Sequence, residues 1–148
     1  METTASLRIE DELEKHGTYA TNTVGVSMRP LFKTHRDAVV LKRAVCELKK
    51  YDIALYTDKG GRYILHRIIG KKEGFYVIRG DNTYIKEYVP RERVIAYMVS
   101  FNRKGKHHST EEFGYKVYSR VWNFIYPVRF LFHKLFAPLR KIRRKLFK

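Results

Sequence analysis

Ser27 is the residue of this chain whose setting best suits a nucleophile. It follows a β-prone run, Thr21 to Val26, and precedes a turn that contains Pro30. A strand that ends at a serine holds the residue while the hydroxyl stays exposed, and N–H groups of the following turn can point at a developing oxyanion. Serine is also common in ordinary turns. Ser27 is therefore a candidate that needs a base elsewhere in the chain.

His66 is the candidate base. It lies in the strand-like segment Tyr63–Gly70, 39 residues after Ser27, a separation that allows two strands to bring the side chains together. An imidazole, with an ordinary pKa of about 6.5, suits proton removal near neutral pH. A lone histidine in a strand is more often a core or surface residue, so the assignment depends on the segments around it.

Four short blocks occur in a characteristic order between Val24 and Arg103. They are Ser27-Met28-Arg29-Pro30, Asp52-Ile53, His66-Arg67-Ile68-Ile69-Gly70 and Gly80-Asp81-Asn82. In this order they resemble the signal-peptidase-I and LexA-type clan of serine peptidases. The chain is most similar to the branch whose general base is histidine, as in the endoplasmic-reticulum and archaeal signal peptidases; the bacterial enzymes have lysine where His66 stands.

The resemblance implies a catalytic set of Ser27, His66 and an acid that orients the imidazole. Asp81 ranks slightly first because it matches the Gly-Asp-Asn block, although an aspartate before an asparagine is also ordinary turn chemistry. Glu87 is the second candidate, since the histidine-type relatives carry an aspartate six residues after the first. Asp52 has a structural role by the same comparison.

The implied substrate is a peptide or protein precursor, bound as an extended strand and cut after a small residue. Backbone N–H groups of Val26 and Ser27 would form the oxyanion hole, because Gly25 stands where many bacterial relatives have a hydroxyl side chain. Met28 and Leu31 either line the substrate groove or pack in the core. No cofactor and no metal is expected, since His107 and His108 lack partners at metal-ligand spacing.

Short β-prone runs separated by turn residues predict a mainly β fold of the LexA/signal-peptidase type, with a coiled β-sheet core. A short N-terminal helix precedes the core, with Leu7, Ile9 and Leu13 as its apolar positions, and Gly17 ends it. The expected division is residues 1–18 for the helix, 19–103 for the β core, 104–110 for a polar linker and 111–148 for a basic amphipathic helical tail. The strands expected within the core are Tyr19–Val26, Asp37–Arg43, Ile53–Thr57, Arg62–Ile69, Phe75–Arg79 and Arg93–Asn102.

The C-terminal tail combines positive charge with an apolar stripe. The formal net charge of the 148-residue chain is +16, and the segment Tyr115–Lys148 has ten Lys or Arg and no Asp or Glu. Glu111–Tyr126 predicts a helix whose broad apolar face includes Phe113, Val117, Val121 and Phe124, with Trp122, and Pro127 should break or kink it. From Val128 onward, apolar residues recur at steps of three and four.

Such a basic amphipathic helix is typical of a membrane interface, and docking on the protein's own core is the alternative. The expected partner is an anionic membrane surface, and nucleic acid is less favoured because lipid would bury the apolar stripe. Neither a signal peptide nor a clear transmembrane run is evident, so we expect peripheral association, with a prokaryotic cytoplasmic membrane as the expected location.

Two other functions remain open. A LexA-like self-cleaving regulator is opposed by the short segment before Ser27 and by the absence of an Ala-Gly or Cys-Gly pair upstream. A catalytically inactive basic module that binds membrane or nucleic acid is disfavoured by the intact set of Ser27, His66 and Asp81.

Overall fold

The computed structural model describes residues 2–146, and side chains from Ile9 to Leu146. Residue 1 and residues 147–148, at the ends of the expected N-terminal helix and C-terminal tail, lie outside this range, as does the side chain of Leu7. The elements, in chain order, are α1 (Glu2–His16), β1 (Thr18–Asn22), β2 (Ala38–Arg43), β3 (Ile53–Thr57), β4 (Tyr63–Lys72), β5 (Phe75–Arg79), β6 (Glu87–Pro90), a 3-10 turn (Arg91–Arg93), β7 (Val94–Arg103), β8 (Lys106–Ser109), α2 (Phe113–Phe124) and α3 (Tyr126–Leu146).

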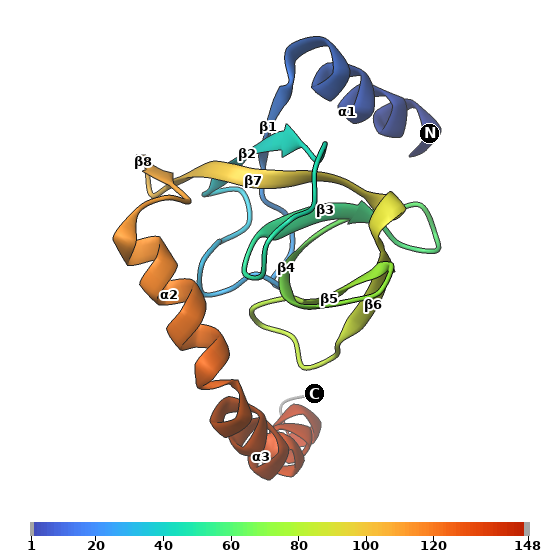
Figure 1. The fold of residues 1–148 in the computed structure, drawn as a ribbon. Helices are drawn as coiled ribbons and strands as arrows, with labels where there is room; N and C mark the ends of the chain where they lie inside the picture. Colours follow the sequence, from blue (N-terminus) through green and yellow to red (C-terminus); the bar gives the residue numbers. More distant parts are fainter. Residues whose placement is uncertain (1, 147–148) are drawn as a thin grey trace.

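The strands of the described residues form one antiparallel sheet, in the order β1-β2-β7-β3-β4-β5-β6, with β8 paired to β7. The sheet curls around its own interior, and α1 lies beyond β1 at one end of the molecule (Figure 1). A mainly antiparallel β core between a short N-terminal helix and C-terminal helices is the architecture expected from the sequence.

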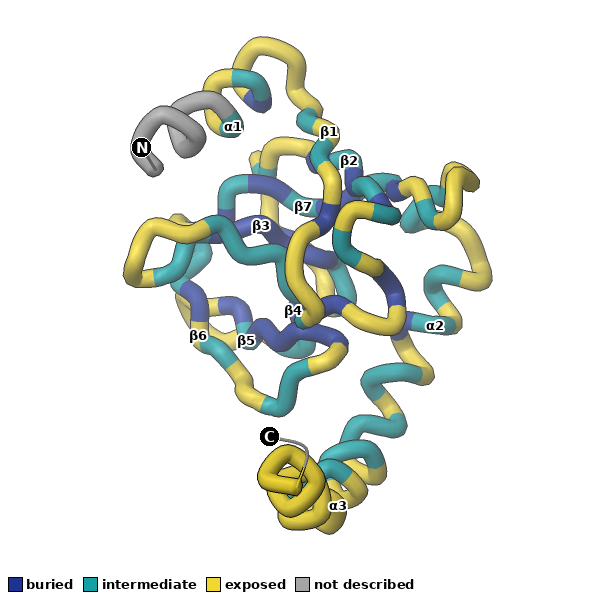
Figure 2. The backbone as a smooth tube through the Cα atoms, turned by 180° about the vertical axis from the view of Figure 1, so that it is seen from behind, coloured by how far each residue is buried: buried dark blue, intermediate teal, exposed yellow. Residues whose placement is uncertain are grey.

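Two clusters of apolar side chains fill the interior of the curled sheet. The first joins α1, the segment after Ser27 and the β2–β7 region, and it includes Leu13, Met28, Leu31 and Phe32, each at most 6% exposed. The second lies between β3, β4 and β5 and includes Ile68 and other aliphatic side chains. These buried segments run through the centre of the molecule, whereas α3 is exposed over most of its length and contains no buried residue (Figure 2).

Two segment predictions were wrong. The expected strand Tyr19–Val26 ends at Asn22, because Thr23 turns the chain by bonding the Asp37 carbonyl through both its N–H (2.9 Å) and its hydroxyl (3.1 Å). The expected linker 104–110 contains strand β8 instead. Lys104 and Gly105 have positive φ values, 52° and 78°, which suit the tight turn of a hairpin.

The C-terminal helices also differ from the expectation. The break falls at Ile125, and Pro127 lies in the first turn of α3, where its missing N–H leaves no hydrogen bond unmade. The apolar face predicted for α2 is divided: Phe113 and Phe124 are 83% and 85% accessible, whereas Trp122, together with Tyr115 and Tyr118, packs on the β core.

Candidate active site

Ser27 lies in a loop between β1 and β2 that is fixed at both ends. At its base, the buried Asp37 carboxylate accepts the N–H of Lys33 at 2.7 Å and of Lys104 at 3.2 Å. Near its tip, Gly25 has φ +90°, a left-handed conformation that glycine adopts without a side-chain clash. Ser27 is therefore on an ordered loop rather than at a strand end.

The turn Gly80–Asn82, between β5 and β6, holds this loop from outside. The N–H of Asn82 donates to the Ser27 carbonyl at 2.7 Å, and the Asn82 side-chain amide donates to the Val26 carbonyl at 3.1 Å. The block Gly80-Asp81-Asn82 thus supplies backbone and amide contacts that hold the loop of the candidate nucleophile.

His66 lies on β4 with a side chain that is 12% exposed. Its Nδ1 is 3.1 Å from Oε2 of Glu87 on β6 and 3.2 Å from the hydroxyl of Tyr56 on β3. The Tyr56 hydroxyl donates its one proton to the same Glu87 oxygen. Both neighbours of Nδ1 are then acceptors, so in the neutral imidazole Nδ1 carries the proton and Nε2 has the free lone pair.

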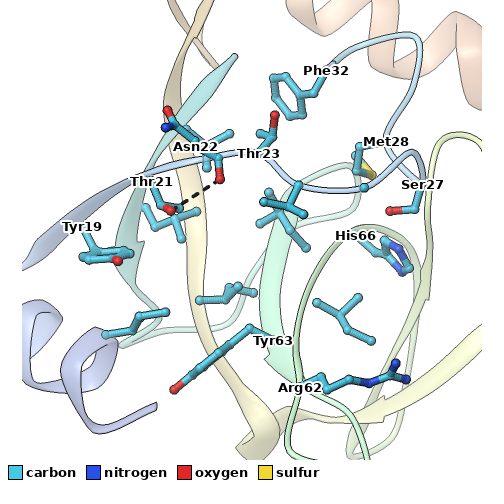
Figure 3. Close-up of a pocket in the computed structure, with 18 residues that line it drawn as sticks. Tyr19, Thr21, Asn22, Thr23, Ser27, Met28, Phe32, Arg62, Tyr63 and His66 are labelled. Atoms are coloured by element: carbon cyan, nitrogen blue, oxygen red, sulfur yellow. Dashed lines mark hydrogen bonds between the residues drawn. The ribbon is translucent and has the colours of Figure 1, made fainter. Parts of the chain in front are cut away.

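Nε2 of His66 and the Ser27 carbonyl oxygen both lie close to Gly80. A Cβ placed on Gly80 would lie 3.1 Å from Nε2 of His66 and 2.8 Å from the Ser27 carbonyl oxygen, so only glycine fits between them. The Ser27 hydroxyl and the His66 ring lie next to each other at one end of a pocket (Figure 3). No hydrogen bond joins these two side chains in the described residues; such contacts often tighten only when substrate binds.

Asp81 does not contact His66. Its carboxylate forms a two-pronged ion pair with the fully buried Arg67, at 2.8 Å to each oxygen, and also accepts the Tyr118 hydroxyl at 2.9 Å. The structure therefore brings Glu87, and not Asp81, to the His66 ring, contrary to the order in which the sequence ranked the two acids. Arg67 follows His66 on β4, and neighbouring strand residues point to opposite faces. The partner of Arg67 consequently lies on the other face from the imidazole.

Burial controls the ionisation of the groups behind the site. It lowers the pKa of Arg67, but the Asp81 carboxylate outweighs that effect and holds the pKa above its ordinary value. Burial, together with the hydrogen bond to Glu87, raises the pKa of Tyr56 well above its ordinary value. Tyr56 therefore stays neutral and acts as a hydrogen-bond donor at physiological pH.

The turn at Ser27 offers N–H donors for an oxyanion. Within the described residues, the N–H groups of Val26 and Ser27 donate to no protein acceptor, while the two carbonyl groups are both bonded. These are the two backbone groups that the sequence suggested for an oxyanion hole.

A pocket of about 450 Å³ extends from Ser27 and His66 between β1 and β4. Met28 lines it although only 6% of the residue is exposed, whereas Leu31 is not part of the lining and packs in the core, the other alternative that the sequence left open. The remaining lining is mostly apolar side chains and the backbone of β1 and β4, among them Tyr19, Thr21, Val39, Leu41, Leu55, Tyr63 and Leu65.

Sequence reasoning missed Tyr56 and the role of Arg67. Tyr56 lies in a run that reads only as a buried strand, so no signal distinguished it. Arg67 belongs to the block around His66, and its charge in an apolar strand could have indicated a buried acidic partner. No cluster of three His, Cys, Asp or Glu side chains that could hold a metal occurs among the described residues.

Comparison with known proteins adds no assignment. No protein-family model matches the chain, and a search of curated proteins finds no similar sequence.

Proposed function

We propose that this protein is a serine endopeptidase of the signal-peptidase/LexA type that cleaves a peptide or protein precursor. The observation that carries the proposal is the position of the His66 ring. Its Nδ1 contacts Glu87, and its Nε2 lies close to Gly80 and the Ser27 loop at the end of a pocket. A nucleophile, a base and an orienting acid in this order are the parts of a catalytic triad.

In this reaction the Ser27 hydroxyl oxygen attacks the carbonyl carbon of the scissile peptide bond, and Nε2 of His66 takes the hydroxyl proton. The Glu87 carboxylate accepts the Nδ1 proton in a hydrogen bond and stabilises the imidazolium. The N–H groups of Val26 and Ser27 bind the oxyanion. When the peptide C–N bond breaks, His66 returns the proton to the leaving amine. Water, with His66 again as the base, then hydrolyses the acyl-serine ester.

The pocket supports an extended peptide as the substrate. β1 is the terminal strand of the sheet, so its outer edge has free N–H and C=O groups that can pair with a further strand. The pocket between β1 and β4 would receive side chains of that strand. A small residue before the cut, as in the enzymes that the sequence resembles, is part of the proposal.

We further propose that the enzyme works at an anionic membrane surface. Exposed apolar side chains follow one stripe of α3, where Leu131, Leu135, Leu139 and Ile142 are each more than 50% accessible, and the same helix has no acidic residue. Lipid would bury the stripe and attract the basic side chains. The helices of the described residues are too short or too polar to cross a membrane.

The experiment is a cleavage screen with a peptide library made from a bacterial proteome, in which new peptide ends are identified by mass spectrometry. Wild-type protein should produce a set of cuts after small residues, and Ser27→Ala should produce none of them. Identical cuts from both proteins would come from a contaminant or another nucleophile. No cuts from either would favour a non-catalytic basic binding module.

A further inference from the structure

Several contacts join the C-terminal helices to the β core, and two of them end on the backbone carbonyl of Asp81. The indole Nε1–H of Trp122 donates to the Asp81 carbonyl at 2.8 Å, and Nη2 of Arg129 donates to the same oxygen at 2.7 Å. The Arg129 guanidinium also lies over the Trp122 ring, 3.7 Å from its centre. One residue comes from α2 and the other from the first turn of α3. Side chains from both sides of the helix junction thus donate to the same backbone oxygen, beside the contacts of Asn123 with Arg79 and of Tyr126 with Tyr84.

The other side of the same turn touches the candidate active site. Gly80 fits between His66 Nε2 and the Ser27 carbonyl, and the Asn82 N–H donates to that carbonyl at 2.7 Å. The Asp81 N–H is 3.5 Å from the Met28 sulfur. Three consecutive residues therefore connect the helix junction to the loop that carries the nucleophile.

We propose that Trp122 and Arg129 are positioning residues for Ser27, so that the C-terminal helices set the rate of peptide cleavage as well as the location of the enzyme. This proposal rests on the proposed peptidase function. The Trp122 N–H and the Arg129 guanidinium both donate to the Asp81 carbonyl and so hold the turn Gly80–Asn82 in position. The turn in its place holds the Ser27 loop against His66. Small displacements of reacting groups cost large factors in rate, because a hydrogen-bonded nucleophile and base tolerate little misalignment.

Two substitutions remove the donors, and Arg129→Gln also removes the guanidinium contacts with Trp122 and Tyr84. Trp122→Phe keeps an aromatic ring beside Tyr118 and under Arg129 but lacks the N–H. Arg129→Gln removes the guanidinium, and Arg129→Lys returns a donor and the charge. Arg140→Gln is the matched control, because it removes the same charge from the same helix, and Arg140 bonds only His133 among the described residues.

The first readout needs no substrate. Amide hydrogen exchange at Asn82, measured by NMR on the full chain, reports the bond to the Ser27 carbonyl. We expect exchange at least threefold faster in Trp122→Phe and Arg129→Gln than in wild type and Arg140→Gln. Equal exchange in all four proteins would overturn the proposal whether or not the protein is a peptidase.

The second readout is cleavage of a peptide found in the library screen, measured in lipid-free solution so that membrane affinity plays no part. We expect kcat to fall about tenfold in Trp122→Phe and in Arg129→Gln with KM changed less than about twofold, and Arg129→Lys to recover part of the loss. The pocket lining is intact in each variant. Unchanged kcat, an equal loss in Arg140→Gln, or a rise in KM alone would contradict positioning. If the wild-type protein itself cleaves no peptide, that result would instead refute the peptidase proposal.

Discussion

Substitutions of Glu87 and Asp81 test which acid serves catalysis, because the Glu87 carboxylate contacts His66 whereas the Asp81 carboxylate pairs with Arg67. Glu87→Gln keeps the shape of the side chain but removes the negative charge beside His66 Nδ1. Opposite charges about 4 Å apart near a protein surface attract by about 4 kcal/mol at an effective dielectric constant of 20. The Glu87 side chain is 37% exposed, so we discount this attraction by about half for solvent screening.

A loss of about 2 kcal/mol from the transition state lowers kcat roughly 30-fold. Glu87→Gln should therefore lose about this factor in turnover while its melting temperature changes little, because the carboxylate is partly solvated.

Asp81→Asn should behave in the opposite way. It leaves the guanidinium of Arg67 buried without a counter-charge, and breaking a buried pair in this manner costs about 3–5 kcal/mol of folding free energy. For a chain of this size that corresponds to a fall in melting temperature of roughly 10 °C. At temperatures where the variant is still folded, its kcat should exceed that of Glu87→Gln.

The assay measures thermal unfolding and steady-state cleavage for both variants beside wild type. The assignment of Glu87 as the acid that orients His66 is refuted if folded Asp81→Asn loses turnover as completely as His66→Ala while Glu87→Gln cleaves at the wild-type rate.

Three further predictions concern the loop, its anchor and the tail. Gly80→Ala should abolish cleavage although it changes no residue that lines the pocket, because the added methyl group would lie 2.8 Å from the Ser27 carbonyl oxygen. Turnover at the wild-type rate would show that the turn does not hold the loop. Burial raises the pKa of Asp37, but the Arg36 side chain and backbone N–H groups outweigh it and lower the pKa from 3.8 to about 2. Asp37 therefore stabilises the fold above about pH 4 and loses this effect as the pH falls toward 2, so Asp37→Asn should cost about 2 kcal/mol in urea unfolding at pH 7 and almost nothing at pH 2; an equal difference at both pH values would contradict the role of the charge. Leu135→Asp should reduce co-sedimentation with anionic vesicles at least tenfold, since burying a leucine contributes about 2 kcal/mol, whereas Val45→Asp, at a still more exposed position off the helix, should not; equal effects would refute α3 as the lipid-binding surface.

The sequence was most informative where local chemistry determines structure. Short β-prone runs separated by turn residues predicted the β core, and the blocks around Ser27 and His66 predicted two residues that the fold brings to one pocket. Both signals are local, because strand periodicity and turn residues act over a few positions.

Long-range pairing could not be predicted. Which acid meets His66 depends on how β6 aligns beside β5, where Glu87 stands opposite Ile78, and no pattern in the sequence fixes that register. The face by which α2 packs on the core could not be predicted for a related reason. The sequence shows the apolar positions of the helix but not their partners, and Tyr118 and Trp122 pack on the core because their polar atoms find partners on Asp81.

The most direct test of the central claim, that the His66 imidazole activates the Ser27 hydroxyl, is chemical rescue. His66→Ala enlarges the pocket at the base position, so free imidazole added to the solution can occupy it. Cleavage of the library-derived peptide by His66→Ala should be nearly abolished and should rise with imidazole concentration, while Ser27→Ala stays inactive at every concentration. Wild-type cleavage by His66→Ala without imidazole would contradict the account.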